Sequence, residues 1–154
     1  MEKFLENLQE AEKLIKRIDH MLYVSYPLIQ DKRLVLKIIS ETKNAIIKCL
    51  NSILQYEYMY KRIRLTKDPK ENMKIFKVKC ASKYNISIEE IKLMSELFEL
   101  IEKHKKSPFE FRKKEKIVIL SENSHPKIIV IDDAKKFLVL AKGILIKSKR
   151  TMQL

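Results

Sequence analysis

Residues 31–65 read DKRLVLKIISETKNAIIKCLNSILQYEYMYKRIRL and contain neither glycine nor proline. Apolar side chains recur here at intervals of three, four or seven residues, the spacing of one face of an α-helix. These positions are Leu34, Ile38, Ala45, Cys49, Ile53, Tyr56, Tyr60 and Ile63. At about 1.5 Å per residue such a helix is on the order of 50 Å long. The stretch therefore predicts one long helix, with Asp31 as its cap, that forms the spine of the molecule.

The segment before this spine predicts a second helix, over about residues 3–25. Its apolar residues alternate in steps of four and three, which makes one stripe. They are Phe4, Leu8, Ala11, Ile15, Ile18 and Leu22. We expect this helix to end near Tyr26, because Pro27 disfavours helical geometry in the preceding residue.

Two helices with clear start signals are predicted after the spine, over about 69–84 and 88–106. Asp68, Pro69 and Glu71 supply a capping carboxylate, a proline at the first helical position and a glutamate three residues after the cap. Ser87 and Glu90 repeat the capping pattern. Asn85 tolerates left-handed geometry and can end the first of these helices. The apolar face of the second is Ile88, Ile91, Met94, Phe98 and Ile101.

The chain changes character after Pro108. KIVIL (116–120) and KIIVI (127–131) are short β-branched runs separated by turn-forming residues, which predicts a small β-hairpin over about 116–131. A last helix follows over about 133–150, with Asp132 as its cap and Gly143 as a point of close packing. Its apolar positions are Phe137, Leu138, Leu140, Ala141, Ile144 and Leu145.

These segments predict a single mainly α domain over 1–154, an antiparallel bundle of about five helices with a small β-hairpin before the last one. A length of 154 residues suits one compact core, and a single glycine favours long regular elements. The opening MEKFLENLQE lacks the apolar core of a signal peptide, and no apolar run reaches the roughly 18 residues of a membrane span. We expect a cytoplasmic protein.

Positive charge is the strongest compositional signal, because 33 Lys and Arg against 20 Asp and Glu give a formal net charge of +13. Much of the excess lies between Lys103 and Arg150. Lysine and arginine that neutralise phosphates release counterions, so such a chain favours a polyanionic partner. The alternative is a bias of the whole proteome, since lysine-rich surfaces are also typical of AT-rich genomes and of adaptation to heat.

Two segments combine aromatic and basic residues, as single-stranded nucleic-acid binders do. The first follows the tyrosines at the end of the long helix, and the second is HKKSPFEFRKKEK, residues 104–116. In the alternative interpretation Tyr56 and Tyr60 belong to the core and Tyr58 alone faces water. The candidate RNA-binding residues are Tyr58, Lys61, Arg62, Arg64, Lys105, Lys106, Arg112, Lys113 and Lys114.

No catalytic, metal or cofactor site is predicted. Cys49 and Cys80 lie in helical patterns without CxxC spacing and are expected to be small core residues. The three histidines, His20, His104 and His125, are scattered, and the paired carboxylates at 89–90 and 132–133 fit helix starts. Phosphate-binding glycine loops are excluded because Gly143 is the only glycine. Arg17, Asp19 and His20 are the only clustered candidates for acid–base chemistry.

The stretches MLYVSYPLIQDKRLVLKII (21–39) and HKKSPFEFRKKEKIVILSE (104–122) resemble short uncharacterised proteins of archaea with reduced genomes. That resemblance implies an archaeal cytoplasmic protein. The long helices, with AIIKCLNSILQYE in the second, also resemble HEPN domains, helical bundles that include ribonucleases. HEPN nucleases use an arginine followed by four to six residues and a histidine. Arg17 and His20 are too close for this motif, and Arg112 and His125 are too far apart.

The leading interpretation is a non-enzymatic binding protein that contacts RNA or a ribonucleoprotein through a basic surface, without a cofactor. One alternative is a protein-interaction module, including a homodimer formed through the long helix or the hairpin edge. The other is a relative of HEPN ribonucleases that lacks their usual catalytic pair.

Overall fold

A computed structural model of the chain describes residues 2–106, 110–113, 116–120 and 126–154, and it is mainly helical. Five helical rods are present in this part of the chain. The first and third rods each contain a π-helical turn, labelled η. The bounds are α1 Lys3–His20 with η1 Met21–Ser25 and α2 Tyr26–Ile29, α3 Lys32–Met59, α4 Pro69–Ile75 with η2 Phe76–Cys80, α5 Ile88–Lys106, and α6 Ile131–Met152. The prediction of a helical bundle is confirmed.

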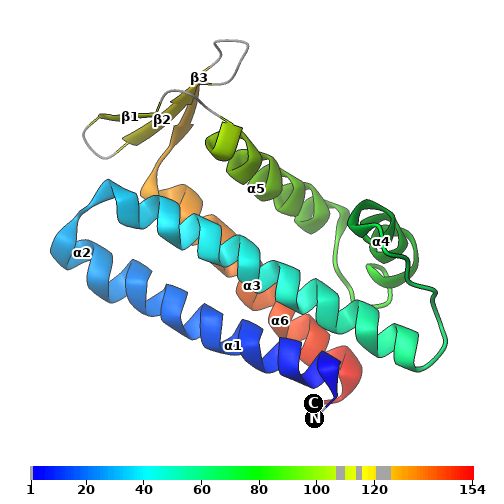
Figure 1. The fold of residues 1–154 in the computed structure, drawn as a ribbon. Coiled ribbons are helices and arrows are strands. Elements are labelled where there is room, and N and C mark those ends of the chain that lie inside the picture. Colours follow the sequence, from blue (N-terminus) through cyan, green and yellow to red (C-terminus); the bar gives the residue numbers. More distant parts are fainter. Residues whose placement is uncertain (1, 107–109, 114–115, 121–125) are drawn as a thin grey trace.

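The core forms where α1, α3 and α6 lie side by side, with α1 antiparallel to α3 (Figure 1). The stripe predicted for the first helix is buried throughout, from Phe4 to Leu22. Ser52 of α3 also donates a buried hydrogen bond to the carbonyl oxygen of Phe4, at 2.7 Å. α5 lies on the side of α3 that faces away from α1, and α4 packs near the carboxyl end of α3 (Figure 1). The predicted apolar face of the last helix is buried as well.

The first helical rod continues past Tyr26, where it was predicted to end. The backbone N–H of Tyr26 donates to the carbonyl of Met21, five residues back, which closes the wider π-helical turn η1. Pro27, which has no backbone N–H to donate, follows this wider turn directly and lies in the first turn of α2. The rod ends after Ile29, and Gln30 takes a left-handed φ of 53°.

The long helix is shorter than predicted, because α3 ends at Met59 and not near residue 65. Lys61 has a left-handed φ of 59°, which turns the chain away from the helix axis. Tyr60 is therefore 53% exposed, so its placement in the core was wrong. Ile63 is buried as predicted, but it reaches the core from the loop between α3 and α4.

The predicted helix caps before α3, α4 and α5 are confirmed. Asp31 accepts a hydrogen bond from the backbone N–H of Arg33, and Asp68 accepts one from that of Lys70. Ser87 and Glu90 exchange reciprocal side-chain to backbone bonds of 3.0 and 3.1 Å. The helical rod of α4 and η2 ends at Cys80, and hydrogen-bonded turns then lead to Asn85, whose φ is 57°.

The cap predicted for the last helix was wrong. α6 begins at Ile131, and Asp133 accepts a hydrogen bond from the backbone N–H of Val130. Asp132 is exposed and forms a 4.0 Å ion pair with Lys135. The shift arises because Val130 is the last extended residue before the helix, so the carboxylate that meets its N–H is the one three positions later.

Between α5 and α6 in the sequence, the chain forms a three-stranded antiparallel sheet. Its strands are β1 Glu110–Lys113, β2 Lys116–Leu120 and β3 Pro126–Ile129, and they lie in that order across the sheet. β2 and β3 pair so that Ile117 lies opposite Ile129. The sequence predicted a two-stranded hairpin over 116–131, whereas β1 adds a third strand on the open edge of β2. The turn predicted at 121–126 falls mostly outside the described residues. Ile129 is 1% exposed and joins the sheet to the helical core.

The predicted apolar face of the fourth helical rod was wrong at its first position. Ile88 is 69% exposed, whereas Leu97 and Leu100, which the pattern omitted, are buried. Cys49 and Cys80 are both fully buried free thiols, as expected for small core residues. Burial raises the pKa of the Cys80 thiol to about 11, so this thiol stays protonated at neutral pH.

Gly143 lies in the interior of α6, and the close packing predicted there was not found. A Cβ atom at this position would lie 3.8 Å from Glu90 Oε2, an ordinary van der Waals contact. We expect Gly143→Ala to raise the free energy of unfolding by about 0.5–1 kcal/mol, because alanine restricts the unfolded chain and suits a helix interior. Urea denaturation measures the gain. A loss of stability would mean that Glu90 cannot accommodate the methyl group.

None of the described helices combines the length and apolarity that crossing a membrane requires.

Candidate nucleic-acid interface

The segment that connects α3 to α5 is strongly basic. Residues 61–83 contain nine lysines and arginines but only two acidic residues, Asp68 and Glu71. The rod of α4 and η2 packs its apolar residues, led by Phe76, against the bundle. Its cations consequently face outward, and all nine basic residues are exposed. They are Lys61, Arg62, Arg64, Lys67, Lys70, Lys74, Lys77, Lys79 and Lys83.

Three of the predicted binding residues come together in a cleft of about 300 Å³ between the α3–α4 loop and the rod of α4 and η2. Lys61, Arg62 and Arg64 line it, together with Lys79. Ile63 and Ile75 contribute the apolar part of the lining. We call this surface the basic cleft. Lys61, Arg64 and Lys79 form no ion pair with any carboxylate of the described residues, so their charges are available to an anion.

A buried carboxylate fixes the loop beside the basic cleft. Glu57, on the last turn of α3, is 2% exposed and lies 2.5 Å from both Arg62 Nε and Lys83 Nζ. Burial alone would raise the pKa of this carboxyl, but the hydrogen bonds from Lys83 and Arg62 outweigh burial and hold its pKa below the ordinary value. The ion pairs tie the loop after α3 to the end of η2. Arg62 is thereby oriented before any ligand binds.

The tyrosines at the end of α3 have three different environments. Tyr56 is half-buried and packs edge-on against Phe4, with ring centroids 5.0 Å apart. Tyr60 lies 4.9 Å from Tyr56, and the Arg62 guanidinium lies 4.8 Å from the Tyr60 ring centroid. Tyr58 is 56% exposed and contacts no other ring or cation among the described residues. Tyr58 faces water, as the alternative interpretation of the sequence expected, but it does not do so alone because Tyr60 is exposed as well.

The other predicted binding residues lie at the opposite end of α3. Lys105 is exposed near the end of α5, and Lys106 ends that helix. Arg112 and Lys113 belong to β1, and the sheet lies at the end of the molecule opposite α4 (Figure 1). Lys114 lies outside the described residues. Because the 28 residues of α3 extend about 40 Å, the two predicted basic segments do not form one surface.

Lys79 and Lys83 belong to the same basic surface, and sequence reasoning did not select them. Both lie on η2 or just after it, more than 15 positions from the tyrosine cluster. The net charge of 61–83 was a signal for them, but the sequence interpretation assigned the excess of positive charge to the region between Lys103 and Arg150. The buried partner of Lys83, Glu57, lies on the helix before the loop and carries no mark in the sequence that distinguishes it from an exposed glutamate.

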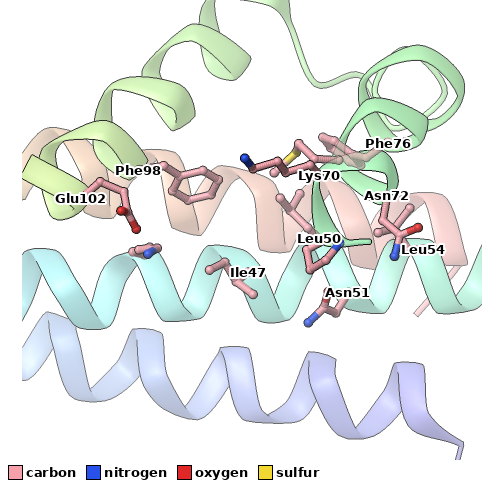
Figure 2. A pocket seen from close by; sticks show the side chains of 12 residues that line it. Ile47, Leu50, Asn51, Leu54, Lys70, Asn72, Phe76, Phe98 and Glu102 are labelled. Carbon is pink, nitrogen blue, oxygen red and sulfur yellow. The ribbon is translucent and has the colours of Figure 1, made fainter. Parts of the chain in front are cut away.

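A second concave surface is an apolar groove of about 670 Å³ between α3, α4 and α5. Figure 2 shows Ile47 and Leu50 on one side and Phe98 on the other, with Lys70 extending across toward Phe98. Asn51, Asn72 and Glu102 supply polar atoms at its edges. The protein-interaction alternative predicts an exposed apolar surface, and this groove is one candidate for it.

Arg17, Asp19 and His20 do not form a site. Arg17 pairs with Glu41 of α3 at 3.0 Å, Asp19 pairs with Lys142 of α6, and His20 is exposed. The three side chains therefore serve different contacts. Within the described residues, no group of three His, Cys, Asp or Glu side chains is placed to hold a metal ion.

Comparison with known proteins finds no family model and no curated protein that matches this sequence.

Proposed function

We propose that this protein binds RNA, alone or within a ribonucleoprotein, through the basic cleft and the exposed cations of α4 and η2 around it. The observation that carries the proposal is the convergence of Lys61, Arg62, Arg64 and Lys79 on one concave surface. Cations on a concave surface add their potentials at one point, which suits the closely spaced phosphates of a nucleic acid. No catalytic step is assigned to this surface.

The arrangement of partners also supports a ligand made of phosphates. Arg62 is held by Glu57, whereas three of its neighbours have no carboxylate partner among the described residues. A cluster of like charges without internal neutralisation destabilises the folded chain and is relieved by a bound polyanion. Tyr58 adds an exposed ring one turn away, and the Lys61 N–H donates to its carbonyl oxygen at 2.9 Å.

The test is binding of a fluorescein-labelled 20-nucleotide RNA of mixed sequence between 50 and 300 mM KCl, with heparin as competitor. We expect the triple variant Lys61→Gln, Arg64→Gln, Lys79→Gln to bind more weakly. The slope of log K against log salt should fall in magnitude by about 2, because each phosphate contact on a single strand contributes about 0.7. Heparin should compete poorly with the RNA.

The matched control is Lys3→Gln, Lys13→Gln, Lys16→Gln, which removes the same charge from exposed positions of α1. Its salt slope should stay that of the wild type. An equal loss in both variants would mean that net charge alone drives binding. A loss confined to Arg112→Gln, Lys113→Gln, Lys114→Gln would move the contact to the other end of α3. Equal preference for RNA and heparin would contradict the proposal and favour the protein-interaction alternative.

A further inference from the structure

The lining of the basic cleft differs from that of a surface that only holds phosphates. Two of its six residues are isoleucines, Ile63 and Ile75, and Ile63 is only 8% exposed. A purely electrostatic site has no use for apolar walls, because phosphates and sugars present polar atoms. A nucleobase, in contrast, has flat apolar faces and a polar edge. The cleft therefore offers an apolar wall with cations around it.

The size of the cleft limits what can enter. About 300 Å³ lies at the lower end of the range for ligand sites, so the cleft accommodates one flat group and not the edge of a duplex. In an A-form helix the bases are stacked on one another, and the deep major groove is closed to side chains. A base can reach Ile63 and Ile75 only when it has left the stack.

Tyr58 supplies a second apolar face on which a nucleobase can stack. Its ring is 56% exposed and is attached one turn from Lys61, a residue that lines the cleft. Tyr60 is already engaged by Tyr56 and Arg62, so the free ring in this cluster is that of Tyr58. Aromatic rings beside a cationic track are the means by which proteins hold successive unstacked bases.

We infer that the ligand of this surface is single-stranded RNA, with one base seated against Ile63 and Ile75 in the basic cleft and a neighbouring base stacked on Tyr58. The inference rests on the proposed function and specifies the class of RNA. Lys61, Arg64 and Lys79 hold the phosphates on either side of the seated base. No sequence preference follows, because each base has a face that stacks.

The experiment compares a labelled 12-nucleotide RNA with the same RNA annealed to its complement, at one salt concentration. We expect the single strand to bind at least tenfold more tightly. Charge alone gives the opposite order, because the duplex has the higher charge density and the steeper salt dependence. Tyr58→Ala should weaken binding of the single strand by about tenfold, the effect of one lost base stack, and leave the duplex unchanged.

Tyr23→Ala is the matched control, because Tyr23 is 49% exposed and lies at the other end of the bundle. It should leave the single-strand affinity unchanged. Equal or tighter binding of the duplex would overturn the inference while the proposed function stands. An unchanged affinity of Tyr58→Ala for the single strand would also overturn the inference. Failure of both RNAs to bind would remove the proposed function itself.

Discussion

The double variant Arg62→Gln, Lys83→Gln should lose about 3 kcal/mol of folding free energy at neutral pH. The reason lies in Glu57, whose carboxylate is 2% exposed and would be left buried without a cationic partner. An unpaired buried charge destabilises a fold by about 3–5 kcal/mol. For a chain of this length we expect a melting temperature lower by roughly 6–12 °C. Urea denaturation followed by circular dichroism measures the change.

Glu57→Gln should cost less, about 1 kcal/mol, although it breaks the same two ion pairs. The side chains of Arg62 and Lys83 are 44% and 40% exposed, so both cations can turn to water when the carboxylate is removed. The amide also keeps an acceptor in place. The order of the two variants, with removal of the cations worse than removal of the anion, follows from the unequal burial of the partners.

The pH dependence of the double variant separates this explanation from a general loss of packing. In the wild type the pKa of Glu57 is lowered, so its contribution to stability is complete above the ordinary value of 4.5 and is lost as the pH falls through the lowered pKa. Without the cations, burial raises the pKa of Glu57. The destabilisation is then complete above that raised pKa, decreases as the pH falls below it, and is gone below the ordinary value. The deficit relative to the wild type should therefore shrink between pH 7 and about pH 4.

Lys74→Gln, Lys77→Gln is the control for lost charge, since both lysines are exposed on the same rod. Among the described residues only Lys74 has an ion-pair partner, the exposed Glu71. The control variant should change stability little at either pH. A deficit in the double variant that is independent of pH would show that Glu57 is not its source.

Phe76→Ala should lower the free energy of unfolding by about 3–5 kcal/mol, the usual effect of emptying a buried phenylalanine site. Phe76 is 1% exposed and is the largest side chain by which η2 packs on the bundle. It also lines the apolar groove between α3 and α5. The urea midpoint should fall with an unchanged m-value, because the same surface is exposed on unfolding.

Val78→Ala, two positions along the same π-helical turn, provides the comparison. Val78 is 79% exposed, so its truncation should change stability by no more than a few tenths of a kcal/mol. A small effect of Phe76→Ala would mean that the rod of α4 and η2 contributes little to the cooperative unfolding of the bundle. A lowered m-value would indicate that the rod has already detached in the variant.

Much of the helical architecture could be predicted because local rules decide it. The buried stripe from Phe4 to Leu22 and the caps at Asp31, Asp68 and Ser87 depend on spacing and on side chains within three residues. The misplaced helix ends have tertiary or conformational causes. Pro27 is tolerated because a π-helical turn precedes it, and the turn after α3 depends on the left-handed Lys61.

The candidate interface was only half predictable. Lys61, Arg62 and Arg64 were found because they follow one another along the chain. Lys79 and Lys83 join them through folding of the rod of α4 and η2, which no local pattern encodes. The resemblances to archaeal proteins and to HEPN domains stay predictions, as does the choice between RNA and a protein partner.

If RNA contacts both predicted basic segments, the length of α3 sets the distance between the two contacts. The basic cleft lies at one end, and the strand with Arg112 and Lys113 lies about 40 Å away at the other. An RNA bound at one end would be presented to the other end at a high effective concentration, provided that the RNA is long enough to span the distance. The affinity would then rise steeply once the RNA is long enough to reach both segments, so the length of α3 would set the minimum length of an RNA that binds tightly.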